Sequence, residues 1–206
     1  SIQWRPQFTL PVEENLDEKL HETVYSVEYQ DILVLVLNST GHLEEQTEYI
    51  REKLTNSDAK WKIVTNHHSV FSPAEGRDFE YARKVWKPMF EKYGVDLVLN
   101  GHDHTYARGH TPVKSQNFNE SGIFKTLYVT SVSGPKQYKI DKVKIKNYEV
   151  DGYKSDKMGE ETQFFQVINI DNKKLTYSAY TTLGNLYDRA IITKDFSNGV
   201  KTISNQ

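Results

Sequence analysis

Apolar and polar positions in the first part of the chain follow patterns typical of strands and helices in succession. Residues 23–29 alternate between apolar and polar side chains, as in a half-buried strand, and residues 32–37 are uniformly apolar, as in a central strand covered on both faces. Only two residues separate these runs, so a hairpin with a tight turn is expected. Apolar side chains then recur at helical spacing over residues 43–54, which predicts a helix.

The succession of strand and helix continues as far as residue 99. Apolar runs at residues 61–65 and 95–99 predict two further strands. Between them, residues 79–93 repeat apolar side chains at helical spacing and end before Gly94, a residue that suits a helix terminus. A strand, helix, strand, helix, strand order predicts right-handed crossovers and a parallel central sheet.

The second half of the chain lacks helices between its apolar runs. Four runs are typical of strands: residues 123–132, 162–170, 175–180 and 186–192. They are expected to pair in antiparallel fashion, in a second sheet. Residues 134–160 contain many lysines and show little periodicity, which predicts an exposed loop or a hairpin insertion. The sequence therefore predicts one α/β domain with a β-rich C-terminal half.

Composition narrows the classes of function. The 206 residues suffice for one domain with a core of its own, without disulfides or structural metals. A net charge of -2 and a pI near 6.4, with no lysine- and arginine-rich run between aromatics, argue against a nucleic-acid face. No apolar stretch approaches the roughly 20 residues of a membrane span, so none is expected. Because the chain has no cysteine, a transition-metal site would use histidine, carboxylate, asparagine or tyrosine ligands.

Histidines follow two of the predicted parallel strands at the point where each strand ends. His67 and His68 come soon after the strand at 61–65, and His102 and His104 lie on the glycine turn after the next strand. The carboxyl ends of parallel strands meet at one sheet edge, where ligands bind in open α/β sheets. Imidazoles converging there could bind one cation or two adjacent ones. The sequence therefore predicts a metal site at this edge.

The residues around these histidines differ in what they can contribute. Only one of the neighbours His67 and His68 can face a shared ligand, so we predict that one of them is a ligand and that the other lies behind it or faces a bound anion. The side chain of Asp103 is expected to point away from the histidines on either side of it. Arg108 and His110 follow the turn and could contact a substrate phosphate, although an exposed loop position explains His110 equally well.

The same residues resemble those of the calcineurin-like metallophosphoesterases and, within them, the purple acid phosphatases. The resemblance rests on the GHDHTYAR element at 101–108 and on the VTNH element at 64–67, and weaker similarity extends over essentially the whole chain. It implies an α/β/β/α sandwich of the metallophosphoesterase type, of which residues 1–206 would form the incomplete C-terminal portion. It also implies a hydrolase that acts on phosphate esters.

This resemblance implies a set of metal ligands. His67 and His102 would bind one ion, typically Zn, Mn or Fe, and His104 a second ion, which is Fe in purple acid phosphatases. Metal-bound hydroxide would attack phosphorus in line. The family's other ligands belong to DxH or DxG, GDxxY and GNH[DE] motifs, which this sequence lacks. Without the bridging carboxylate two close cations would repel each other, so these 206 residues alone are expected to be inactive and metal-free or partly occupied.

Two other functions stay open at this point. The chain could be a non-catalytic interaction module, or His67, His102 and His104 could hold one zinc with a water as the fourth ligand.

An incomplete sheet would expose an edge and predicts a dimer. Relatives are often exported, so the same is expected of the parent protein. Substrate selection is expected in the loops 71–78 and 108–120.

Overall fold

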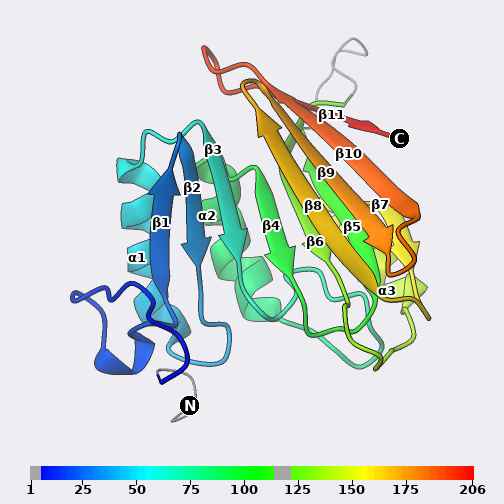
Figure 1. Ribbon diagram of the computed structural model, residues 1–206, viewed down its shortest axis with the longest axis horizontal. Coiled ribbons are helices and arrows are strands. Elements are labelled where there is room, and N and C mark those ends of the chain that lie inside the picture. Colours follow the sequence, from blue (N-terminus) through cyan, green and yellow to red (C-terminus); the bar gives the residue numbers. More distant parts are fainter. Residues whose placement is uncertain (1–5, 114–121) are drawn as a thin grey trace.

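Two β-sheets packed face to face form the centre of the computed structural model, which describes residues 6–113 and 122–206 (Figure 1). The strands are β1 (Tyr25–Tyr29), β2 (Ile32–Val36), β3 (Trp61–Thr65), β4 (Leu97–Asn100), β5 (Tyr106–Pro112), β6 (Phe124–Thr130), β7 (Lys154–Gly159), β8 (Phe164–Asp171), β9 (Lys174–Thr181), β10 (Leu186–Lys194) and β11 (Lys201–Asn205). The helices are α1 (Leu43–Asn56), a π-helical segment (Ala82–Trp86) that continues into α2 (Lys87–Lys92), α3 (Lys142–Asn147), and 3-10 turns at Glu18–Leu20 and Tyr148–Asp151.

The larger sheet has seven strands in the order β1-β2-β3-β4-β6-β5-β7. Strands β2, β3, β4 and β6 run parallel, which confirms the predicted parallel centre. β1 and β2 form the expected antiparallel hairpin. Its two turn residues, Gln30 and Asp31, have φ angles of 47° and 64°, as the tight turns of such hairpins require.

The smaller sheet is antiparallel throughout, in the order β11-β10-β9-β8, and confirms the expected second sheet. Four elements differ from the sequence prediction. Residues 123–132 were expected in the second sheet, but β6 lies in the larger sheet and pairs in parallel with β4. β5 was not predicted, because most of its residues were assigned to a loop. β11 was not predicted, because its residues are mostly polar. Residues 134–160 are not merely an exposed loop: they include α3 and β7, and they bury Ile145, Tyr148 and Tyr153. The many lysines of this segment lie mostly on its outer side, and they made its buried apolar residues hard to recognise from the sequence.

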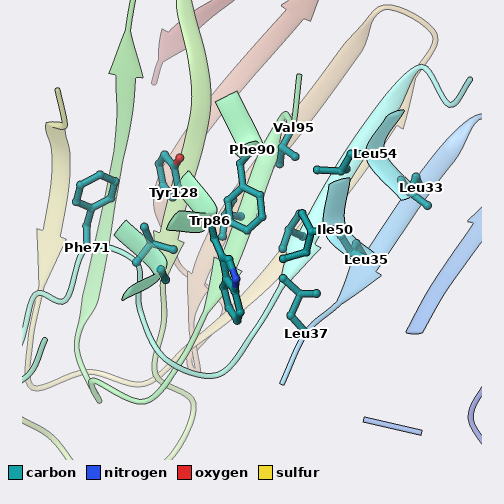
Figure 2. Packing of buried hydrophobic residues seen from close by; sticks show 14 of the residues in the cluster. Leu33, Leu35, Leu37, Ile50, Leu54, Phe71, Trp86, Phe90, Val95 and Tyr128 are labelled. Carbon is teal, nitrogen blue, oxygen red and sulfur yellow. The ribbon is translucent and has the colours of Figure 1, made fainter. Parts of the chain in front are cut away.

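Two hydrophobic clusters divide the molecule into three layers. On one face of the larger sheet, Leu35 of β2 packs in a cluster with Ile50 of α1 and with Trp86 and Phe90 of the second helical segment (Figure 2). On the other face, residues such as Leu97 pack against the smaller sheet, seen in orange in Figure 1. The described residues thus form helix, sheet and sheet layers of the expected sandwich. Within this described part, no helix covers the outer face of the smaller sheet.

Strands β1, β7, β8 and β11 lie at sheet edges. An edge strand can pair with another chain, and the dimer suggested by the sequence stays a prediction. None of the helices described is both long and apolar enough to cross a membrane.

Candidate functional site

Hydrogen bonds join the turns that follow β3 and β4, next to the histidines. The Gly101 N–H donates to the His67 carbonyl at 2.9 Å, and the Ser69 hydroxyl donates to the Gly101 carbonyl at 3.0 Å. Below these bonds, the buried Asn100 amide donates to the backbone and side-chain oxygens of Asn66, both at 3.0 Å. The two histidine-bearing turns are therefore fixed relative to each other by the backbone and by buried amides.

Replacing Asn100 with alanine is expected to lower the free energy of unfolding by about 1–3 kcal/mol, because the buried polar groups of Asn66 lose their partner. Urea denaturation of the purified chain would measure this loss. Asn169→Ala, on the exposed face of β8, is the matched control and is expected to change stability by less than about 0.5 kcal/mol. Equal effects of the two substitutions would contradict a bracing role for Asn100.

The glycine turn after β4 adopts an unusual backbone conformation. His102 and His104 have φ angles of 67° and 49°, in the left-handed region that L side chains rarely adopt. Both side chains line one hollow together with His67 and Gly134. Asp103, between them, is fully buried and accepts a hydrogen bond from the Ala74 N–H at 3.2 Å. The turn therefore directs both imidazoles to the hollow and the carboxyl group into the protein, and strain of this kind is often found at functional sites.

His67 and His102 form a close pair. The Nε2 atom of His67 lies 3.0 Å from the Nδ1 atom of His102. Burial, followed by the charges of His68 and Arg77, lowers the pKa of His102 to about 4, so its ring is neutral at neutral pH. Two tetrahedral zinc ligands at the usual bond length would lie roughly 3.3 Å apart, so these two nitrogens fit a single ion with little movement.

His104 is held through one of its two ring nitrogens. Its Nδ1 atom lies 3.0 Å from the carbonyl oxygen of Lys136, which can only accept a hydrogen bond. Nδ1 therefore carries the proton, and Nε2 keeps a free lone pair for a metal, as is usual for metal-binding histidines.

His68 lies beside the pair rather than within it. Its ring centroid is 4.1 Å from that of His102. The Ser39 hydroxyl accepts from the His68 backbone N–H and bonds its Nδ1 atom, both at 2.9 Å. Burial lowers the pKa of His68. His68 thus lies next to the pair, and its supporting role stays a prediction.

The histidines fit a metal centre in part. His67 and His102 fit one ion and His104 can offer one nitrogen to another, but among the described residues no three metal-binding side chains come together. The mononuclear zinc site, which needs all three histidines around one ion, stays a prediction.

Arg108 and His110 occupy a different environment from the one expected. Both lie on β5, between β6 and β7, where Arg108 is 1% and His110 4% exposed. Arg108 makes a two-pronged ion pair with Asp188 at 2.7 and 2.9 Å and also contacts Asp156, which bonds His110 at 2.7 Å. These buried pairs leave neither side chain facing the hollow, so we assign both a structural role instead of contact with a phosphate. Residues 114–120 of the second selection loop lie outside the described part.

Sequence reasoning missed two side chains that lie next to the histidines. Arg77 contacts His102, and its other terminal nitrogen donates to the Tyr138 hydroxyl at 3.0 Å. The Tyr138 ring in turn lies 5.0 Å from the ring of His104. Loop 71–78 was expected to select substrates, but nothing in the sequence brings it next to residue 138.

Known proteins share sequence similarity with this chain. The family model described as calcineurin-like phosphoesterase matches residues 10–106. Purple acid phosphatase 17 of Arabidopsis thaliana is 41% identical over 51 residues, which cover 25% of this chain and 15% of that protein. Purple acid phosphatase 1 of Ipomoea batatas is 29% identical over 92 residues, which cover 41% of this chain and 20% of that protein. The matched segments are thus well short of these relatives' full lengths.

Solved structures share the fold. The purple acid phosphatase PPD1 from yellow lupin superposes with a TM-score of 0.66 at 20% identity, over 93% of this chain and 35% of that one. PhoD superposes with a TM-score of 0.59 at 10% identity, over 95% of this chain and 47% of that one.

Proposed function

Because the chain carries a purple-acid-phosphatase-like domain of the calcineurin-like phosphoesterase family, we propose that it supplies the histidine ligands of a dinuclear metal centre in a phosphate-ester hydrolase. The observation that carries this proposal is the 3.0 Å approach of His67 Nε2 to His102 Nδ1, from the ends of two adjacent parallel strands. The resemblance suggests Fe paired with Zn, Mn or Fe.

Each residue of the site has a separate task in this proposal. His67 and His102 hold one ion, and His104 holds the other through Nε2, with its ring fixed by the Lys136 carbonyl. Ser39 orients His68 beside the pair. Such ions, when bound, polarise phosphoryl oxygens and lower the pKa of water.

We further propose that these 206 residues alone do not hydrolyse phosphate esters. The motifs that bear the family's other ligands do not occur in the sequence, and the described residues offer no group of three ligands. Carboxylates from outside these residues would be needed to hold two like-charged ions side by side.

Metal content and hydrolysis of an aryl phosphate test both parts of the proposal. The full-length gene product is expected to contain two metal ions per chain, to lose hydrolysis on chelation and to recover it when metal returns. The 206-residue chain is expected to contain less than one ion per chain and to show no hydrolysis above the blank. A full-length product that neither binds metal nor hydrolyses the ester would contradict the enzyme proposal and favour an interaction module. Hydrolysis by the 206-residue chain would contradict the second part.

A further inference from the structure

We propose that Arg77 binds the phosphate group of the substrate beside the His67–His102 pair, an inference that rests on the proposed hydrolase function. Arg77 is half-buried at the rim of the histidine cluster. Its Nη1 atom lies 2.5 Å from His102 Nε2, and its Nη2 atom donates to the Tyr138 hydroxyl at 3.0 Å. The guanidinium carbon lies 5.1 Å from the Tyr138 ring centroid. A planar guanidinium held in this way suits two-pronged recognition of a phosphate.

The backbone that carries Arg77 is clamped to the segment that begins α3. The Lys144 ammonium donates to the Arg77 carbonyl at 2.7 Å and also to the Ala74 carbonyl. The Glu75 N–H donates to the Lys139 carbonyl at 3.0 Å. Since both ends of this short loop are bonded to 139–144, the guanidinium is placed by the fold and not by a flexible loop.

Charge distinguishes Arg77 from the arginine that follows it in sequence. Arg83 pairs with the carboxylates of Asp78 and Asp151, at 2.6 and 3.0 Å. Within the described residues, Arg77 forms no ion pair with any carboxylate, and the buried carboxyl group of Asp103 interacts with its charge only at longer range. A fixed cation without a counterion favours the binding of an anion.

The hydrogen bonds of His102 indicate how Arg77 could be freed to bind a phosphate. A guanidinium has donors only, so His102 Nε2 must accept from it and His102 Nδ1 must carry the proton that it shares with His67. When His102 instead uses Nδ1 as a metal ligand, its neutral ring carries the proton on Nε2. That N–H cannot pair with another donor. Arg77 then loses its bond to His102, stays on Tyr138 and turns its free N–H groups to the hollow, where a phosphate oxygen can accept them.

Binding of inorganic phosphate to the metal-loaded full-length protein, measured by calorimetry, tests this inference. Arg77→Met is expected to weaken phosphate binding about tenfold to a hundredfold, the usual loss for a hydrogen bond between charged groups. In hydrolysis of an aryl phosphate, its KM should rise by more than its kcat falls. Arg77→Lys, which keeps the charge, should recover part of the affinity. Arg51→Met, which removes an exposed arginine paired with Glu48, is the matched control and should bind phosphate as the unsubstituted protein does.

Measuring the metal content of the same samples distinguishes a loss of phosphate binding from a loss of metal. Unchanged metal content with weakened phosphate binding supports the inference. Unchanged phosphate affinity in Arg77→Met overturns it, and so does a loss of phosphate binding that merely accompanies a loss of metal, because Arg77 would then only position His102. If the methionine variant does not fold, Arg77→Gln, which keeps a donor for Tyr138 but removes the charge, carries the same expectations. An unsubstituted protein without metal or hydrolysis would contradict the proposed function instead.

Discussion

The full-length protein with His102→Ala is expected to lose more than about 100-fold of its kcat/KM toward an aryl phosphate. Loss of a group that merely orients a metal ligand already costs about 10–100-fold in metal affinity or activity, and loss of the ligand itself should cost more. In the structure, His102 supplies one of the two facing nitrogens of its pair, so His67 alone would remain of that pair to hold the ion. Metal analysis should show less than two ions per chain.

Two further substitutions make this prediction specific. His104→Ala should cause a comparable loss through the other ion. His21→Ala removes an imidazole that bonds the Leu16 carbonyl, and should leave hydrolysis within about twofold of the unsubstituted protein. Undiminished activity in either His102→Ala or His104→Ala would refute the assignment of that histidine.

The parallel centre of the fold and the position of the histidines were predictable from local patterns. Uniformly apolar runs separated by helical periodicity indicate a parallel sheet, and the carboxyl ends of such strands must share an edge. His67 and His102, at the ends of neighbouring strands, follow from that rule alone. The other residues of the site could not be predicted from this rule. The Lys136 carbonyl that orients His104 is a backbone atom, which no residue type could reveal.

The interpretation of Arg108 and His110 shows where sequence reasoning fails. A charged side chain soon after a turn indicates an exposed loop unless its partners are known. Here the partners of Arg108 lie 48 and 80 positions further along the chain, on β7 and β10, and only pairing within and between the two sheets brings them together. The lysine-rich segment that contains Tyr138 was misjudged for a similar reason, because its contacts with residues 73–77 are equally distant in sequence.

Replacing Arg108 with methionine is expected to lower the free energy of unfolding by about 3–5 kcal/mol at pH 7, because two buried carboxylates lose their cation. Asp188 and Asp156 are only 3–4% exposed in their side chains, and the remaining donors to Asp188 include the neutral Tyr106 hydroxyl. Urea denaturation would measure the loss. Arg189→Met removes the same charge from the outer face of β10 and should cost about 1 kcal/mol or less.

The pH dependence of that loss provides a stricter test. Burial alone would raise the pKa of Asp188, but hydrogen bonds from Arg108 and Tyr106 outweigh it and hold the pKa below the ordinary value of 3.8. The stabilisation is therefore present in full above pH 3.8 and is lost as the pH falls through the folded-state pKa. Without Arg108, burial raises the pKa of Asp188. Lowering the pH then protonates Asp188 and removes an unpaired buried charge from the variant, while in the unsubstituted protein it breaks the ion pair and lowers the free energy of unfolding. The difference in stability between the two should thus shrink between pH 6 and pH 3, and a constant difference would show that Arg108 stabilises the fold by packing rather than by its charge.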